Sequence, residues 1–345
     1  MKALITGGLG FIGSHISEHY ASQGWDITVI DNLSRPKLLN REIKNIDFNM
    51  KFLQKNFPKV KIINEDINNS SALNDAAKGA DVIFHTAAQT AVTTSVTNPR
   101  ADFETNALGS FNVLEAARKN DVKSLIYCST NKVFGDNVNK VKVVSGEKRY
   151  SFEDDYRHGI SETFPLDLCE HTPYGISKFI GDLYAQDYSH IYGIRTGVFR
   201  MSCIYGTRQF GVEDQGWVAW FTIAAILGKP ITIYGDGKQV RDVLYVKDLV
   251  RLYDSFLKSK LKHGVFNTGG GPKNTMSLIE LREILKEVTG KESQISFSDW
   301  RPSDQKVFIA DIRKAERDLG WKPEISPKEG VAKLAAWVQE NKAIF

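Results

Sequence analysis

The chain has 345 residues, of which 42% are hydrophobic and 25% are charged. Because these are the proportions of globular proteins, the composition excludes a largely disordered chain and predicts one large domain or two joined lobes. The net charge is +4 at pH 7, and the Lys and Arg residues are interleaved with acidic residues. This distribution argues against a nucleic-acid-binding surface.

The cysteines and histidines form no metal-binding pattern. There are 3 cysteines and 7 histidines, and their spacing matches no zinc motif, so we expect no metal site. So few cysteines in a long chain fit a reducing compartment. The sequence also has no signal-peptide pattern and no apolar run of membrane-spanning length. We therefore expect a cytoplasmic protein.

Short β-rich runs alternate with amphipathic stretches in the first part of the chain. The pattern predicts strands over residues 3–5, 27–30, 60–63, 82–84 and 124–127, and helices over residues 11–22, 71–77 and 102–120. Strands that alternate with helices at this interval form parallel sheets covered by helices. The sequence therefore predicts an α/β fold with a Rossmann-type, doubly wound parallel sheet.

Two long segments interrupt this alternation. Residues 36–58 are interpreted as an inserted helical excursion, and the polar residues 138–171 as a mobile or lid-like loop. After about residue 210 the alternation becomes irregular. There the pattern predicts helices over 217–227, 277–287 and 327–341 and strands over 231–234 and 240–245, on either side of a turn at 235–237. We expect this part to form a smaller C-terminal α/β lobe.

Residues 6–13 contain the pattern G-x-x-G-x-x-G directly after a predicted strand and at the start of a predicted helix. In this context Gly7 and Gly10 let the backbone approach a pyrophosphate, Gly13 lets the helix pack on the sheet, and the helix N-terminus offers N–H donors. Asp31 ends the second predicted strand, where it would accept hydrogen bonds from an adenosine ribose and repel a 2′-phosphate. This favours NAD over NADP, although Arg35 is close enough in sequence to weaken the preference.

Tyr174 and Lys178 are spaced i and i+4, so on a helix they share a face. A Lys ammonium beside a Tyr hydroxyl favours the phenolate and lowers the pKa of the tyrosine. Tyr174 could then take a proton from a sugar hydroxyl while hydride leaves the same carbon. The same spacing recurs at Tyr234 and Lys238, but two glycines lie between them, so we expect a turn there and a chance match.

Thr130 follows the predicted strand 124–127, and hydroxyl residues at strand ends lie where doubly wound sheets bind ligands. We expect Thr130 to share the hydrogen bond of the sugar hydroxyl with Tyr174. A simple strand-capping role is the alternative for an isolated threonine.

Taken in chain order, these motifs resemble the extended short-chain dehydrogenases/reductases, a family of NAD-dependent epimerases and dehydratases. The resemblance covers residues 2–337 and includes Phe199 with Arg200 and Arg241 with Asp242. Within the family the chain is most similar to the CDP-paratose 2-epimerases, also called CDP-tyvelose 2-epimerases. That similarity rests on residues 129–133, 172–178, 208–210, 214–218, 237–244 and 303–305. Phe134 and Met201 depart from it, because a Tyr and a His are common at these positions.

The resemblance implies NAD as the cofactor, residues 1–200 as the NAD-binding domain, and residues 201–345 as mainly a substrate-binding lobe, with chain crossings between the two. It implies NAD contacts at Gly7, Gly10, Phe11, Ile12, Asp31, Asn32, Ser34, Arg35, Asp66, Ile67, Ala87, Ala88, Gln89, Asn106, Tyr174 and Lys178. It implies substrate contacts at Thr130, Asn131, Lys132, Ser202, Gln209, Gln215, Tyr234, Arg241 and Arg301. Arg241 and Arg301 are the candidates for a diphosphate, because guanidinium binds phosphate through paired hydrogen bonds.

The residues after Thr130 favour one reaction within this family. Sugar-nucleotide dehydratases of this fold typically carry an Asp-Glu pair there, which supplies the acid and base for loss of water. Here the positions hold Asn131 and Lys132, so we expect epimerisation at C2, from CDP-paratose to CDP-tyvelose. GDP- or UDP-linked sugars and C4 epimerisation remain open. So does an NAD(P)-binding regulator without chemistry, although the intact Tyr174/Lys178 pair argues against it. By analogy with relatives we expect a homodimer or homotetramer.

Overall fold

The structure is a computed structural model that describes residues 1–39, 44–301 and 304–345. Residues 40–43 of the expected excursion and Ser303 of the 303–305 motif lie outside the described residues. Across the described ranges, no helix is both long enough and apolar enough to cross a membrane.

The chain forms two compact units. The first unit comprises Met1–Val133, Thr172–Arg200 and Tyr253–Phe266, and the second comprises Phe134–His171, Met201–Leu252 and Asn267–Phe345. Residues 134–171 thus belong to the second unit, inside the range 1–200 that was expected to bind NAD. The assignment of NAD to residues 1–200 and of substrate to residues 201–345 stays a prediction.

The first unit is built on a seven-stranded sheet with the order β12-β8-β5-β4-β1-β2-β3. Its strands are β1 (Lys2–Thr6), β2 (Asp26–Ile30), β3 (Lys61–Ile63), β4 (Val82–His85), β5 (Ser124–Thr130), β8 (Arg195–Met201) and β12 (His263–Thr268). The β3–β2–β1–β4–β5 pairs are parallel. From β1 the chain first extends the sheet through β2 and β3, and then continues on the other side of β1 with β4. Such a switch point opens a ligand-binding crevice at the carboxyl ends of the strands, here between β1 and β4. The predicted doubly wound sheet is confirmed.

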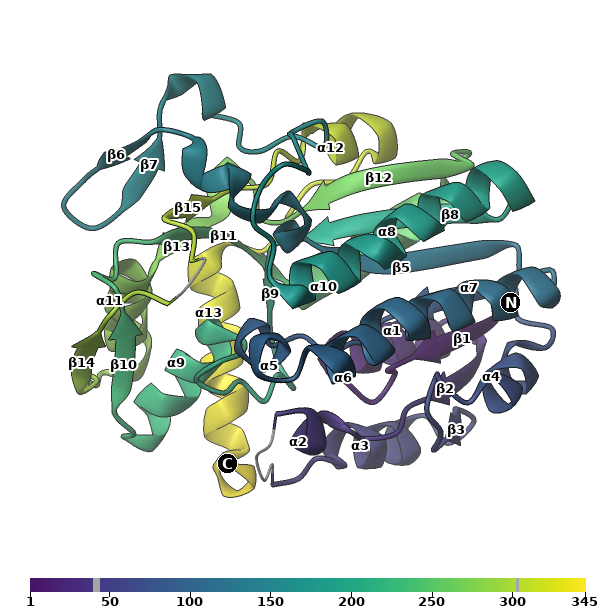
Figure 1. The fold of residues 1–345 in the computed structure, drawn as a ribbon. Helices are drawn as coiled ribbons and strands as arrows, with labels where there is room; N and C mark the ends of the chain where they lie inside the picture. The colour runs from purple at the N-terminus through teal and green to yellow at the C-terminus, as the bar shows by residue number, and fades with distance from the viewer. Residues whose placement is uncertain (40–43, 302–303) are drawn as a thin grey trace. The chain divides into compact units, whose positions relative to one another are not determined.

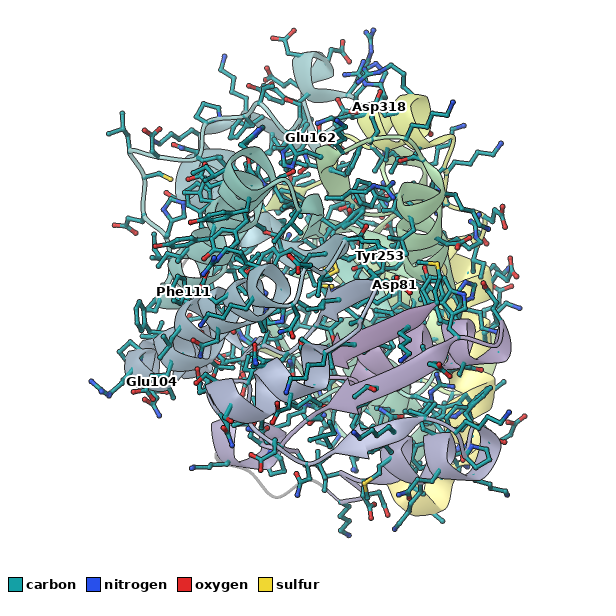
Figure 2. All side chains as sticks on the ribbon, turned by 90° about the vertical axis from the view of Figure 1, so that its right-hand side faces the viewer. Asp81, Glu104, Phe111, Glu162, Tyr253 and Asp318 are labelled. Carbon is teal, nitrogen blue, oxygen red and sulfur yellow. The ribbon has the colours of Figure 1, made fainter. Side chains whose placement is uncertain are left out.

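Side chains on alternate strand positions bury the two faces of this sheet separately. Leu4, Ile83 and Leu125 lie in one buried cluster together with residues of the helices α4 (Ser70–Ala77), α7 (Gly109–Lys119) and α8 (Pro173–Tyr192). Figure 1 shows α7 and α8 side by side across the sheet. Phe84 follows Ile83 and therefore points to the opposite face. There its ring lies 5.0 Å from that of Tyr20 in α1 (Phe11–Ser22) and 6.4 Å from that of Tyr253, which Figure 2 labels.

The helix predicted over residues 102–120 is three elements in the structure. These are α6 (Pro99–Phe103), a π-helical turn (Glu104–Leu108) and α7. The Asn98 side chain caps α6 by accepting a hydrogen bond from the Ala101 N–H. The π turn contains Asn106, whose side chain is hydrogen-bonded to two other segments of the first unit. π turns are frequent at functional sites because they insert one residue and redirect the side chains around it.

Shorter helices fill the remaining connections of the first unit. In the expected excursion 36–58 the structure describes α2 (Arg35–Leu38) and α3 (Phe48–Asn56), and α5 (Val92–Thr97) follows β4. The helical interpretation of the excursion is confirmed in these described parts.

The second unit contains small sheets and four helices that belong to it entirely. The strands are β6 (Val143–Ser145), β7 (Tyr150–Phe152), β9 (Cys203–Tyr205), β10 (Ile231–Tyr234), β11 (Val240–Tyr245), β13 (Thr275–Ser277), β14 (Ile295–Ser298) and β15 (Val307–Phe308). The helices are α9 (Trp217–Leu227), α11 (Leu278–Thr289), α12 (Arg313–Leu319) and α13 (Pro327–Glu340), and α10 (Val246–Lys258) runs from this unit into the first. Short 3-10 turns lie at Asn131–Lys140, Asp154–Tyr156, Pro272–Asn274 and Lys342–Ile344.

The turn at residues 235–237 joins two strands that do not pair with each other. β10 pairs with β14, whereas β11 pairs with β9, β13 and β15. Gly235 and Gly237 both have φ values in the left-handed region, +87° and +79°. Tyr234 and Lys238 are therefore on either side of a turn and not on one helix, as expected for the chance copy of the motif.

Residues 138–171 contain regular structure. β6 and β7 form a hairpin, and Arg149 donates two hydrogen bonds of 2.6 and 2.7 Å to the carboxylate of Glu280 in α11. The Ser277 hydroxyl donates to the Lys148 carbonyl at 2.8 Å. These contacts fasten the hairpin within the second unit, and the lid-like role stays a prediction.

Candidate active site

The glycine turn lies at the switch point of the sheet, between the ends of β1 and β4. Gly7 has a φ of +67°, and a Cβ there would lie 2.6 Å from the backbone nitrogen of Ala87. A side chain at Gly13 would overlap the Gly7 carbonyl. Gly10 precedes α1 and no side chain caps this helix end. The N–H groups of the first turn, at Phe11 and Ile12, are thus not engaged by a capping side chain, and an anion can approach them.

Asp31 lies directly after β2, and its carboxylate holds the glycine turn in place. Its two oxygens accept hydrogen bonds from the Leu9 N–H at 3.0 Å and the Leu33 N–H at 2.8 Å. Burial raises the pKa of Asp31, and the backbone donors partly offset this effect. Each carboxylate oxygen has a further lone pair, so ribose hydroxyls can still be bound. Burial also lowers the pKa of Arg35 to about 10.

Asn32 and Asp66, from the ends of two neighbouring strands, are hydrogen-bonded to each other. The Asn32 amide donates to Asp66 at 2.7 Å and accepts a hydrogen bond from the Ser34 N–H at 3.0 Å. Ile67 is only 5% exposed and belongs to the buried cluster of the first unit. These residues were expected to contact NAD, and the structure brings Asn32 and Asp66 together after neighbouring strands.

A buried polar network follows β4 after Ala87 and Ala88. Gln89 and Asn106 exchange two hydrogen bonds of 2.9 Å through the backbone of Gln89 and the amide of Asn106. The Gln89 amide donates to Asp102 at 2.8 Å, and Asn106 also donates to Asp102 and to Ser177, both at 3.1 Å. This network connects the end of β4 to the helix α8.

Asp102 and Ser177 were missed by the sequence analysis. The second oxygen of Asp102 is buried without a hydrogen-bond partner among the described residues, and burial raises the pKa of this carboxyl group. The spacing of Asp102 and Asn106, i and i+4 within a predicted helix, was the available signal, because it places both side chains on one face.

Tyr174 and Lys178 lie in the first half of α8. The helix begins with Pro173 at its first position and is capped by the Thr172 hydroxyl, which accepts a hydrogen bond from the Gly175 N–H at 3.2 Å. The Tyr174 N–H donates to the Ser95 hydroxyl at 3.1 Å. Tyr174 is 9% exposed and Lys178 only 3%. The helix therefore presents both side chains within the first unit, at the spacing predicted.

The expectation of a lowered pKa for Tyr174 is wrong for the described structure. Burial raises the pKa of Tyr174 to about 12, and the contribution that opposes this is hydrogen bonding with the side chain of Thr130. Burial also lowers the pKa of Lys178 to about 8. Two buried groups that are each disfavoured in their charged form fit a proton-transfer site, since such shifts concentrate at active sites.

Thr130 is the last residue of β5 and is 6% exposed. Its hydroxyl accepts a hydrogen bond from the Lys132 N–H at 3.3 Å, lies 3.4 Å from the Asn131 amide oxygen and is hydrogen-bonded with the side chain of Tyr174. The structure thus brings Thr130 and Tyr174 together within the first unit, with Asn131 and Lys132 directly after them in the 3-10 turn.

In the second unit, Arg301 and Tyr234 form one cluster. The Arg301 guanidinium lies 4.0 Å from the centre of the Tyr234 ring and 3.1 Å from the Asp214 carboxylate. The Tyr234 hydroxyl donates to Glu213 at 3.1 Å. Two of the expected substrate residues therefore lie together.

Arg241 lies in a separate set of contacts in the second unit. Its guanidinium donates to Asp304 at 2.7 Å and to the Gln305 carbonyl at 2.6 Å. To bind a diphosphate, Arg241 would have to exchange the hydrogen bond with Asp304 for one with phosphate. Ser202 donates to the buried Asp242, whose pKa is raised to about 6 by burial.

The two expected glutamines differ in how they are held. Gln209 donates to the Ile204 carbonyl at 3.2 Å, while its amide oxygen is buried without a partner among the described residues. Gln215 exchanges two backbone hydrogen bonds of 2.9 Å with Val212. Their role toward a substrate stays a prediction.

The first unit fits a dinucleotide. Gly7 leaves no room for a Cβ against Ala87, the end of α1 has no side-chain cap, and Asp31 lies at the end of the neighbouring strand. A pyrophosphate at the helix end and a ribose at Asp31 would satisfy these groups.

Comparisons with known proteins identify the family of this chain. Residues 3–269 match the NAD dependent epimerase/dehydratase family. The CDP-paratose 2-epimerase of Salmonella typhi is 42% identical over 98% of this chain and 99% of its own length. The structure of UDP-glucose 4-epimerase from Thermotoga maritima with UDP-glucose has a TM-score of 0.82 and 30% identity, and the match covers 99% of this chain and 100% of that one. That of Thermus thermophilus UDP-glucose 4-epimerase with NAD has a TM-score of 0.79 and 29% identity, with 98% of each chain covered.

The family description matches more than half of the chain, and the relatives are similar over nearly their whole length. The glycine turn, Asp31 and the Tyr174/Lys178 helix lie within the matched residues. The chain therefore belongs to the NAD dependent epimerase/dehydratase family, and NAD is its cofactor.

Proposed function

We propose that this protein inverts C2 of a nucleotide-linked sugar, converting CDP-paratose to CDP-tyvelose. The observation that carries the proposal is the Tyr174, Thr130 and Lys178 arrangement, followed by Asn131 and Lys132 where no carboxylate is available. The 42% identity with a CDP-paratose 2-epimerase supports the choice of sugar and nucleotide.

Tyr174 acts as the base in the first step and as the acid in the last. Its phenolate oxygen takes the proton of the C2 hydroxyl, and the C2–H bond electrons leave as hydride, so a 2-keto sugar forms. NAD, which the glycine turn and Asp31 would hold, would supply the acceptor and later the donor of this hydride. The 2-keto sugar then rotates within the site so that its opposite face is presented. Hydride returns to that face of C2, and Tyr174 returns its proton to the oxygen. The cofactor is unchanged after each turnover.

Thr130 and Lys178 make the proton transfer possible. Hydrogen bonding from Thr130 favours the phenolate form of Tyr174, whose pKa burial otherwise raises. Lys178, on the same helix face, supplies a positive charge that favours the same form. Arg241 and Arg301 of the second unit are the proposed diphosphate ligands.

Loss of water from the sugar would need an acid and a base beside Thr130. Asn131 is neutral and Lys132 is cationic, so neither can act as the paired carboxylic acid and carboxylate. The site therefore supports oxidation and re-reduction at one carbon in preference to elimination.

A UDP- or GDP-hexose 2- or 4-epimerase is the second candidate. It is supported by the similarity to the UDP-glucose 4-epimerase structures, because the same three catalytic groups serve either carbon, depending on how the sugar lies. A regulator without chemistry would not need an intact, buried Tyr174/Lys178 pair. The expected cytoplasmic location and homo-oligomeric state remain part of the proposal.

The test is incubation of the purified protein with CDP-, GDP- and UDP-linked hexoses, with NMR of the configuration at C2 and C4. We expect inversion at C2 of the CDP-linked 3,6-dideoxyhexose. Tyr174→Phe should abolish turnover and retain NAD. Full activity of that variant would contradict the mechanism, and inversion at C4 alone would favour the second candidate.

A further inference from the structure

The ammonium group of Lys178 lies against an aromatic ring. Its Nζ is 4.5 Å from the centre of the Tyr127 ring, and Tyr127 is fully buried in β5. Within the described part of the chain, Lys178 takes part in no ion pair. The ring face is therefore a close electrostatic contact of the lysine.

The same tyrosine also holds the helix that carries the lysine. The Tyr127 hydroxyl donates a 3.0 Å hydrogen bond to the backbone carbonyl of Lys178. The hydroxyl reaches α8 because Gly181 lies there, since a Cβ at this position would overlap the Tyr127 oxygen. One side chain thus contacts Lys178 at both its ammonium and its backbone.

An aromatic ring affects a lysine differently from a carboxylate. The ring favours the charged form of the lysine, but it forms no ion pair with the ammonium group. The N–H donors of the ammonium therefore stay available to a ligand or to the Tyr174 oxygen. Burial holds the pKa of Tyr127 well above its usual range, so its ring is neutral and cannot replace Tyr174 as the base.

Other charged or titratable groups also face Lys178. They come from four elements and are His85 in β4, Cys128 in β5, Asp102 in α6 and Asp182 in α8. Asp182 is engaged by Arg200 at 3.0 Å and by the Ser129 hydroxyl at 2.6 Å. Asp102 is engaged by Gln89 and Asn106. Asp182 is thus committed to other donors and Asp102 is engaged through one of its two oxygens, whereas the face of Tyr127 is directed at the ammonium.

We infer that Tyr127 is a positioning residue for the reaction proposed above, on which this inference rests. Its ring holds the ammonium of Lys178 in its charged form, and its hydroxyl fixes the helix turn that places the ammonium on the Tyr174 face of α8.

The test varies the ring's charge distribution without changing its shape. Tyr127 is replaced by Phe and then by Phe carrying one, two and three ring fluorines, each of which weakens the negative face of the ring. In the full-length protein saturated with NAD, the Lys178 pKa is read by NMR of ¹³Cε-labelled lysine, with the signal assigned by its loss in Lys178→Met. The same trifluorinated residue at Phe84, on the opposite face of the sheet, is the matched control.

Tyr127→Phe should leave the Lys178 pKa within a few tenths of a unit, roughly, because the ring remains. The fluorinated series should lower it progressively, by about one unit at three fluorines. The turnover rate should decline in parallel, with a smaller effect on KM, and the Phe84 variant should change neither.

A Lys178 pKa that is constant along the series, in variants with unchanged melting temperature, would overturn the inference whatever the substrate is. The NMR reading does not depend on the sugar. If the Lys178 pKa shifts progressively but the protein inverts no sugar, the proposed function is rejected. The inference that the Tyr127 ring stabilises the charged form of Lys178 is then still supported.

Discussion

At the scale of single residues, the proposed proton transfer depends on Tyr174 and on its hydrogen bonding with Thr130. Burial raises the pKa of Tyr174 to about 12, and hydrogen bonding from Thr130 acts in the opposite direction. Thr130→Val keeps the shape and removes the donor, so the Tyr174 pKa should rise. The kcat/KM at pH 7 should then fall by roughly 10²-fold, and the rising limb of the pH–rate profile should move to higher pH.

Thr130→Ser is the control for this prediction, because it keeps the hydroxyl and should stay within about tenfold of the wild type. A Thr130→Val enzyme with the wild-type pH profile would show that Thr130 does not act on the proton of Tyr174.

We expect the buried ammonium of Lys178 to lower the free energy of unfolding of the protein. Its pKa is lowered to about 8 by burial, from an ordinary value of 10.5. Between these values the unfolded chain binds a proton that the folded chain has released, so stability should rise with pH through this window. Below pH 8 the folded state bears the full cost of the buried charge. Lys178→Met should therefore raise the free energy of unfolding at pH 7 by roughly 1–3 kcal/mol and abolish turnover.

Urea unfolding at pH 7, 9 and 10.5 checks this prediction. The advantage of Lys178→Met should shrink steadily and be lost near pH 10.5. A variant that is less stable than the wild type at pH 7 would mean that contacts such as the Tyr127 ring outweigh the cost of burying the charge.

The glycine turn can be tested as an element with a matched pair of glycines. Gly7 and Gly24 both have left-handed φ values, +67° and +81°, but a Cβ meets the backbone of Ala87 at Gly7 and nothing within 4 Å at Gly24. Gly24→Ala should cost about 1–2 kcal/mol through the backbone conformation alone and leave NAD affinity unchanged. Gly7→Ala should cost more and weaken NAD binding at least tenfold. Calorimetric titration with NAD and thermal unfolding distinguish the two, and equal effects would contradict the assignment of Gly7.

Local signals predicted the elements that carry the cofactor and the catalytic pair. The order of strand, glycines and helix predicted β1 and α1, and the spacing of Tyr174 and Lys178 predicted α8. Such predictions succeed because hydrophobic periodicity and glycine placement are local properties of the sequence. The helix expected over 102–120 is confirmed as helical structure, but the π turn within it was not predicted. The π turn around Asn106 depends on hydrogen bonds to Gln89 and Ser177, the latter 71 residues away.

The groups that support the catalytic pair could not be predicted in this way. Tyr127 contacts Lys178 across 51 residues of sequence, and Asp102 is buried only because β4, α6 and α8 meet. The raised pKa of Tyr174 likewise depends on burial of its side chain, and the spacing of a sequence motif does not predict burial. One signal was available, since a glycine within a helix, here Gly181, marks a place where another group can approach closely, in this case the Tyr127 hydroxyl.

At the scale of the whole molecule, the first unit carries an exposed apolar face on α7, α8 and the π turn. Its large exposed side chains, together with Phe103 at the end of α6, are Leu108, Phe111, Ile176, Leu183, Tyr184, Ile191 and Tyr192. The Phe111 and Tyr184 rings lie 5.7 Å apart in an edge-to-face contact, and Figure 2 labels Phe111. Contiguous apolar surface of this kind marks interaction sites. We expect this face to bind a second copy of the chain.

Leu183→Glu should dissociate such an oligomer, because it places a charge among the exposed apolar side chains of α8. Leu183 is 48% exposed, so the folded unit should tolerate the change. Val144→Glu is the control, since Val144 is 55% exposed on the hairpin β6 of the second unit. Sedimentation velocity should show a lower mass for Leu183→Glu alone. A wild-type protein that sediments as a monomer would refute the expectation.

Transient oxidation at one sugar carbon is the claim on which the account depends, and a deuterium label tests it most directly. CDP-paratose carrying deuterium at C2 is incubated with the protein in ordinary water, and the product is analysed by NMR. Hydride transfer away from C2 and back to it without exchange with water predicts CDP-tyvelose that keeps its deuterium at C2. Inversion with loss of the label to solvent, or no inversion at C2, would contradict it.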